Sequence, residues 1–167
     1  LEEKTASAVE RMHRLGFSDD VDSALANVSD SELIGWRSNE YLVYARLLAA
    51  QGKTGLSLRV LERMAQVTQE HGLYWVLYRT WITQAMVYFQ DHQADTAMQI
   101  MAQLLEQTAQ LDAGIARVYL SAGEPARALL NEAARRAIQP AHTARLLAEF
   151  PAVSRVTRPS DMPETLT

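Results

Sequence analysis

Apolar residues recur along most of this chain at steps of three and four positions, the spacing of one face of an α-helix. No stretch alternates apolar and polar residues in a β-branched context, so the pattern indicates no strands. Gly52 and Gly72 follow two of the apolar stripes, and Pro125 and Pro140 stand where two others begin. The pattern predicts helices over residues 1–15, 36–51, 54–71, 73–89, 94–110, 113–122, 125 onwards and 140–150. Residues 17–35 form a polar connection with room for a short helix.

The predicted helix over residues 73–89 is apolar on most of its sides. Its large residues are Tyr74, Trp75, Leu77, Tyr78, Trp81, Ile82, Met86, Tyr88 and Phe89. Such a helix usually lies between neighbours on more than one side. The connections between most helices are only a few residues long, which makes successive helices antiparallel. The pattern therefore predicts an all-α fold of about seven to eight helices arranged as helical hairpins.

Two segments, 41–64 and 81–104, resemble each other at an offset of 40 residues. Large residues match at packing positions, and small residues match where two helices approach closely. The matched pairs are Tyr41 with Trp81, Ala45 with Ala85, Leu48 with Tyr88, Ser57 with Ala97, Leu61 with Met101 and Met64 with Leu104. This pairing is typical of the tetratricopeptide hairpin, although the usual period of that repeat is about 34 residues. A generic helical bundle also has amphipathic helices but shows this pairing less often.

A degenerate third copy is expected over residues 116–133, with Ala116, Tyr119, Gly123 and Ala128 in the matching roles. We therefore expect residues 1–150 to form one alpha-alpha superhelix of tetratricopeptide-like helical hairpins. Three prolines, at 151, 159 and 163, indicate that residues 151–167 are a linker.

Composition and charge argue against several classes of function. The chain has 16 Lys and Arg against 20 Asp and Glu, a net charge of −4, so it lacks the basic character of a nucleic-acid binder. It has no cysteine, which excludes disulfides and thiolate chemistry and fits a cytoplasmic protein. No apolar run approaches the roughly 20 residues that span a membrane. The 167 residues and 48% hydrophobic content suit one compact domain or a short solenoid.

Motifs with catalytic potential are weak. Gly52-Lys53-Thr54 resembles the end of a phosphate-binding loop, but Leu47 stands where that loop needs a glycine, and a helix precedes it. A helix cap followed by a turn is the favoured interpretation. The four histidines are far apart and have no ligand partner at helical spacing, so no metal site is expected. The aromatic residues of 73–89 suit a core more than a ligand cage. We therefore expect no catalytic residues and no enzyme activity.

Candidate binding residues follow from the repeat geometry. In a tetratricopeptide solenoid the first helix of each hairpin lines the concave face, and this geometry predicts a groove lined by Asn39, Arg46, Arg79, Met86, Phe89 and Arg117. Three arginines there would suit an anionic ligand or a carboxylate-bearing peptide. The alternative is that these arginines pair with carboxylates on the surface.

Two sequence segments resemble a known protein family. NEYLVYARLLAAQGK (39–53), with the amphipathic LSLRVLERM (56–64), resembles the repeat region of large ATP-dependent transcription regulators of the LuxR family, MalT-like subgroup. GIARVYLSAGEPARALLNEAARR (114–136), followed by HTARLLAEFP (142–151), resembles the phrase that closes that array. The final Glu164-Thr165-Leu166-Thr167 resembles the junction to the family's helix-turn-helix domain.

The resemblance implies a specific architecture for the parent protein. An ATPase module would precede this segment and a DNA-binding domain would follow it, so ATP and DNA would bind outside this chain. The chain itself would need no cofactor. Its partner would be a small-molecule inducer or a protein, and the parent could self-associate on induction. The competing hypothesis is a free-standing tetratricopeptide adaptor that binds a partner peptide in its concave groove.

Overall fold

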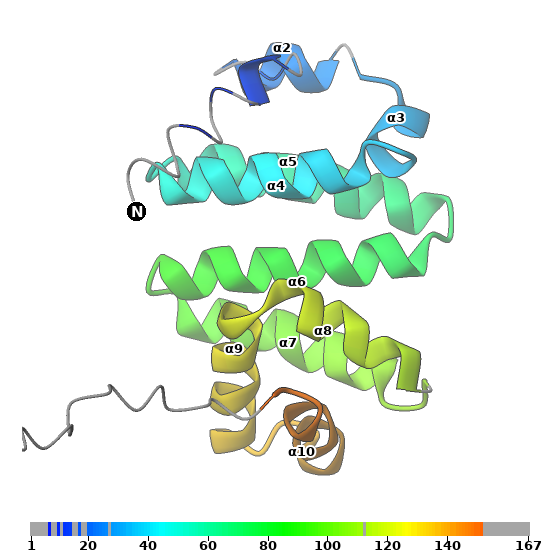
Figure 1. Ribbon diagram of the computed structural model, residues 1–167, viewed down its shortest axis with the longest axis vertical. Helices are drawn as coiled ribbons and strands as arrows, with labels where there is room; N and C mark the ends of the chain where they lie inside the picture. Colours follow the sequence, from blue (N-terminus) through cyan, green and yellow to red (C-terminus); the bar gives the residue numbers. More distant parts are fainter. Residues whose placement is uncertain are drawn as a thin grey trace, which may run out of the picture.

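The computed structural model describes residues 20–26, 28–111 and 113–151, together with 7, 10, 12–14 and 17. Within these ranges the protein is all-α, as predicted, with nine α-helices and no strand (Figure 1). The expected helix over 1–15 lies largely outside the described residues, as does the expected linker after Pro151. The elements are α2 (Val21–Ala26), α3 (Asp30–Ile34), α4 (Ser38–Ala50), α5 (Thr54–Glu70), α6 (Tyr74–Gln90), α7 (Ala94–Thr108), the 3-10 turn η1 (Ala113–Ile115), α8 (Ala116–Ala122), α9 (Glu124–Arg135) and α10 (Pro140–Ala148).

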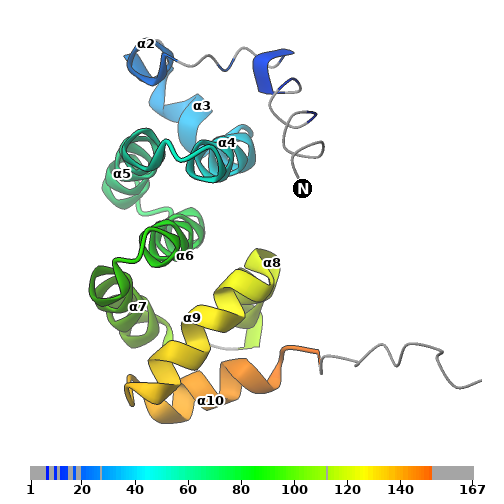
Figure 2. The same cartoon turned by 90° about the vertical axis from the view of Figure 1, so that its left-hand side faces the viewer.

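The four long helices α4 to α7 form two stacked antiparallel hairpins. Figure 2 shows α4 and α6 in one layer and α5 and α7 in the other, with α8 on the same side as α4 and α6. The contacts follow this order, since α6 packs on α5, α7, α4, α8 and α9. Ten of its seventeen residues are buried, as expected for a helix with neighbours on several sides.

Four helices, α4, α5, α6 and α9, end in the same type of left-handed turn. After α4, the amide of Lys53 donates to the carbonyl of Leu48 at 2.9 Å, and Gly52, at φ +76°, donates to Ala49. This Schellman motif satisfies carbonyls that the helix leaves open. It also confirms the interpretation of Gly52-Lys53-Thr54 as a cap and turn. The same pair of hydrogen bonds recurs after α5, α6 and α9, with left-handed Gly72, His92 and Ala137.

The repeat is visible in the packing. The second helices of the two hairpins begin 40 residues apart, α5 at Thr54 and α7 at Ala94. The small residues matched across the two copies, Ala45 with Ala85 and Ser57 with Ala97, are all fully buried. They allow the backbones to approach closely, while Leu61, Met64, Met101 and Leu104 fill the core between them. The α6 helix is longer than α4 by about one turn at its N-terminal end.

The structure departs from the sequence expectations at three places. The connection over 17–35 contains two short helices, α2 and α3, which raises the helix number above the seven or eight predicted. The expected helix from Trp36 begins two residues later, at Ser38, after a turn. In the third copy Ala128 is exposed and Ala126 is buried instead, because residues two apart lie on opposite sides of a helix and α9 turns the side with Ala126 toward the core. The helix α9 also runs obliquely to the stack (Figure 2).

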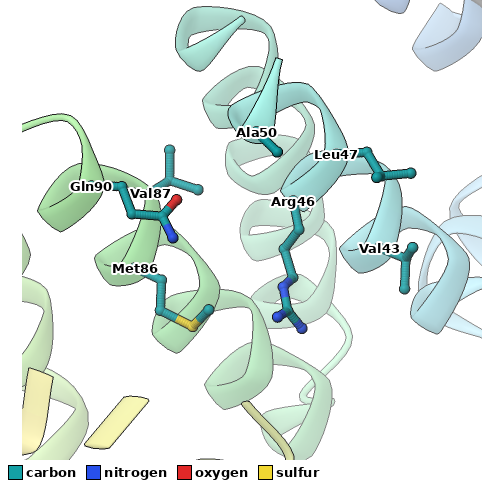
Figure 3. Close-up of a pocket in the computed structure, with 7 residues that line it drawn as sticks. All are labelled: Val43, Arg46, Leu47, Ala50, Met86, Val87 and Gln90. Carbon is teal, nitrogen blue, oxygen red and sulfur yellow. The ribbon is translucent and has the colours of Figure 1, made fainter. Parts of the chain in front are cut away.

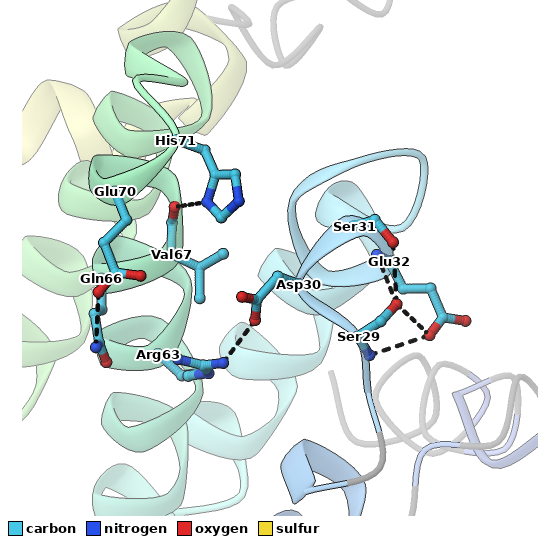
Figure 4. Close-up of polar contacts among 9 residues, drawn as sticks. All are labelled: Ser29, Asp30, Ser31, Glu32, Arg63, Gln66, Val67, Glu70 and His71. Carbon is cyan, nitrogen blue, oxygen red and sulfur yellow. Dashed lines mark hydrogen bonds and ion pairs between the residues drawn. The ribbon is translucent and has the colours of Figure 1, made fainter.

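Polar contacts explain why α3 forms and where it lies (Figure 4). Ser29 and Glu32 make a capping box, in which the Ser29 hydroxyl accepts from the Glu32 amide and the Glu32 carboxylate accepts from the Ser29 amide. Arg63 on α5 donates to Asp30 at 2.6 Å. The capping-box residues were present in the sequence, but the helix is too short to show a periodic apolar stripe, and the contact with Arg63 joins residues that are far apart in the chain.

Among the described residues, no helix is both long and apolar enough to cross a membrane.

Candidate functional site

The candidate site lies on the face formed by α4, α6 and α8. On α4, Asn39, Val43, Leu47 and Ala50 follow one another at three- and four-residue steps and so share one side of the helix. The matching row on α6 is Arg79, Thr83, Met86 and Gln90. Two adjoining hollows lie between these rows, and both are lined by Val43 and Arg46.

The first hollow has a volume of about 280 Å³, and its lining is half polar and half apolar. The polar lining residues are Asn39, Arg46, Arg79, Thr83 and Ser121, and the apolar ones are Leu42, Val43, Ile82, Val118 and Ala122. Val118, Ser121 and Ala122 come from α8. Arg79 donates a hydrogen bond from its guanidinium to the Asn39 side-chain oxygen. Burial lowers the pKa of Arg79 from its ordinary value, because partial desolvation disfavours its charge. The Asn39 oxygen is a neutral acceptor, so the cation keeps its full charge.

The second hollow is mainly apolar and has a volume of about 330 Å³. Figure 3 shows Met86 and Gln90 on α6 facing Arg46 on α4 across it. The remaining lining residues are aliphatic: Val43, Leu47, Ala50 and Val87. Val43 is 47% exposed, a large fraction for a branched apolar side chain on a well-packed helix. The hollow therefore presents apolar surface to solvent directly beside an arginine.

The charges of this face are not neutralised within the described chain. Arg46 forms no hydrogen bond or ion pair with any described residue, and Arg79 bonds only to Asn39 through its side chain. Several arginines elsewhere pair with carboxylates, as Arg63 does with Asp30, although Arg145 contacts the His142 ring and the Leu111 carbonyl instead. The alternative interpretation, that the groove arginines pair with surface carboxylates, thus finds no support among the described contacts.

The structure brings together four of the six predicted groove residues: Asn39, Arg46, Arg79 and Met86. The other two lie elsewhere. Phe89 is partly buried and packs against the core around α6 and α7. Arg117 is exposed on α8 and lines neither hollow.

Sequence reasoning missed several aliphatic members of the site, Val43, Leu47 and Ala50 on α4 and Val87 on α6. A signal for the α4 residues was available, because they continue the row that Asn39 begins. These three residues were not identified from the sequence because they are apolar, and an apolar row on a repeat helix is normally assigned to the core. The residues contributed by α8 had no such signal.

The aromatic residues of α6 divide between core and surface. Tyr78 and Trp81 are each 8% exposed and belong to the core, in line with the interpretation favoured from sequence. Tyr74 and Trp75 occupy the first turn of α6 and are exposed. None of the four lines either of the two hollows.

A separate buried polar cluster joins α10 to α7 and α8. The Nδ1 atom of His142 lies 2.9 Å from the Arg145 guanidinium, which can only donate, so Nδ1 accepts and carries no proton. Its Nε2–H then donates to the Thr108 hydroxyl at 3.0 Å, which also contacts the Tyr119 hydroxyl. Burial, aided by Arg145, lowers the pKa of His142, and burial raises the pKa of Tyr119 to about 12. This cluster is satisfied internally and serves packing.

Across the residues that the structure describes, no three metal-binding side chains are grouped so that they could hold an ion. No family model, no curated protein and no solved structure matches this chain.

Proposed function

We propose that this chain is a ligand-sensing helical repeat module that binds an anionic effector on its α4/α6/α8 face. The observation that carries the proposal is the placement of Arg46 and Arg79 around one hollow, where neither forms an ion pair with a carboxylate of the described residues. Solvated surface arginines need no partner, but Arg79 is partly desolvated, and its only side-chain partner among the described residues is the neutral Asn39. A bound carboxylate would supply one, and guanidinium groups bind carboxylates through paired, charge-assisted hydrogen bonds.

The position of the hollows suits a sensor. Arg46 belongs to the first hairpin, Arg79 to the second and Val118 to the third, so a ligand here would contact three successive hairpins. A ligand that binds one arrangement of these hairpins better than another shifts the solenoid toward that arrangement. This is how effector binding on this face would reach the rest of a larger protein.

The parent that fits such a sensor best is a LuxR-type, MalT-like transcription regulator, the family that the repeat phrases resemble. The support is that resemblance, together with an acidic chain that would leave DNA contact to another domain. The gene sequence after Thr167 tests it. A helix-turn-helix coding region is the expected finding, and a stop codon at that point would exclude the regulator.

The second candidate is a free-standing adaptor that holds a partner peptide on the same face. The observation in its favour is the length of the face, since the row from Asn39 to Ala50 extends about 16 Å along α4. It shares the arginines with the first candidate but predicts that peptides bind better than small carboxylates.

Calorimetric titration with succinate, butanoate and inorganic phosphate tests the anion site. We expect carboxylate binding that weakens about tenfold or more in Arg46→Ala and in Arg79→Ala, since hydrogen bonds to charged groups contribute about 1.5–3 kcal/mol. Arg117→Ala is the matched control, because it removes an exposed arginine of α8 outside both hollows. The absence of binding for every anion, or equal losses in all three variants, would remove the proposed site.

A further inference from the structure

The two hollows differ in their polar residues. Both arginines line the first hollow, here called the polar half, together with Asn39 and the hydroxyls of Thr83 and Ser121. The polar half also contains an equal number of apolar residues: Leu42, Val43, Ile82, Val118 and Ala122. In the second hollow, the apolar half, Gln90 and the shared Arg46 are the only polar members of the lining. Aliphatic surface therefore runs through both halves, while Asn39, Arg79 and both hydroxyls lie in the first alone.

We propose that the effector is an amphipathic carboxylate, with one anionic head and one aliphatic tail. The assignment rests on the proposed anion site and specifies its ligand. The head lies between Arg46 and Arg79 and is positioned by Asn39. The tail follows the row of α4 past Val43 and Leu47, and it contacts Met86 on α6.

Charge complementarity fixes the head. Two guanidinium groups from facing helices lie around the polar hollow without a carboxylate partner among the described residues, and one of them is partly desolvated. A single carboxylate has two oxygens and accepts from both groups at once. An uncharged head would leave the desolvated Arg79 without a counter-ion.

The apolar half fixes the tail. Val43 leaves about half of its surface in water, and the Leu47 side chain beside it is also partly exposed. An aliphatic chain placed here removes both from solvent at no cost in lost hydrogen bonds. Met86 forms the opposite wall, and its flexible thioether adapts to tails of different shape.

A small molecule fits this division better than a peptide does. A peptide carries an amide donor and a carbonyl acceptor at every residue, and a buried amide group without a partner is costly. The apolar hollow offers it the side chains of Gln90 and Arg46 alone. The volumes of about 330 and 280 Å³ also lie at the scale of small-ligand pockets.

The test is a chain-length series of straight alkanoates, from butanoate to decanoate, titrated calorimetrically below their micelle concentrations. We expect the dissociation constant to fall about three- to fourfold for each added methylene until the apolar hollow is full. Octanol, which has the tail without the charge, should bind at least tenfold more weakly than octanoate. Arg46→Gln should weaken octanoate and butanoate by the same factor, because both present the same head.

Leu47→Gln separates the tail from the head, because Leu47 lines the apolar hollow alone. This change at a partly exposed helix position puts a polar amide against the tail, so it should weaken decanoate severalfold and leave butanoate, with its short tail, unchanged. Circular dichroism of the variant verifies the fold.

Each possible outcome decides between the proposals. Arginine-dependent binding with no gain along the series would overturn the amphipathic ligand and leave the anion site standing. A failure of all alkanoates and of succinate would overturn both. A tripeptide with aliphatic side chains and a free carboxylate, such as Ala-Leu-Leu, should bind more weakly than octanoate; tighter binding would replace the small molecule by a peptide.

Discussion

Replacing Ser57 by alanine should make the protein more stable. Ser57 lies in the first part of α5 and is fully buried, and its hydroxyl has no hydrogen-bond partner among the described residues. Buried threonines on α5 and on its counterpart α7 avoid this situation. Thr68 and Thr108 each donate to the carbonyl four residues before them, at 2.7 and 2.8 Å. The Ser57 hydroxyl therefore loses its hydrogen bonds to water on folding and gains none in return.

The magnitude follows from that loss. An unsatisfied buried polar group costs about 1–3 kcal/mol, and alanine also has the higher helix propensity. The small void left by one oxygen reduces the gain, so Ser57→Ala should raise the free energy of unfolding by about 1–2 kcal/mol. For a chain of this size the midpoint of thermal unfolding should rise by about 2–8 °C.

Urea unfolding followed by circular dichroism measures the change, with an unaltered m-value as the sign that the unfolded reference is the same. The repeat supplies a matched control. Ala97 occupies the equivalent position in the second hairpin, so Ala97→Ser should lower stability by a similar amount. If Ser57→Ala is instead destabilising, the hydroxyl donates to a backbone acceptor, such as the Lys53 carbonyl one turn earlier, and the reasoning fails.

Three further predictions concern caps and protons. Ala137 adopts φ +54° at the end of α9, so Ala137→Gly should stabilise the fold by about 0.5–1 kcal/mol in thermal unfolding, whereas Gly52→Ala, at φ +76°, should destabilise it. Ser29→Ala removes one half of the α3 capping box and should cost about 1 kcal/mol; no change in urea unfolding would show that α3 needs no cap. The pKa of His142 is lowered in the folded state from its ordinary value of 6.5. Below pH 6.5 the unfolded chain therefore binds a proton that the folded chain does not, so the free energy of unfolding falls as the pH drops from 7.5 toward 5.5. His142→Gln should remove this dependence, and an unchanged pH profile in that variant would assign it to other groups.

Much of the fold could be predicted because its signals are local. The 3.6-residue periodicity and the cap glycines located α4 to α7 to within two residues at each end. The small buried pairs, such as Ala45 with Ala85, revealed the hairpin repeat. The two short helices within residues 17–35 were harder to predict, because six and five residues are too few to show a periodic apolar stripe. α3 is stabilised by the Ser29 cap and by the ion pair between Arg63 and Asp30, and neither produces periodicity.

The candidate site could be predicted only in part. Repeat geometry placed Asn39, Arg46 and Arg79 on a common face, since their helices follow the regular stack. It failed for Arg117, because α8 does not continue that stack. The helix α8 follows the 3-10 turn η1, has only seven residues and ends at Gly123. The directions of its side chains therefore cannot be extrapolated from those of α4 and α6.

The same irregularity gives the site its shape. In a regular array the face formed by α4 and α6 would continue into a third long helix, and the groove would stay open along its length. Here the short α8 adds Val118, Ser121 and Ala122 to the wall of the hollow that both arginines line. The other hollow is lined by α4 and α6 alone. A departure from the repeat thus gives the two ends of the groove different walls. Such local departures from an otherwise consistent pattern are where function is expected.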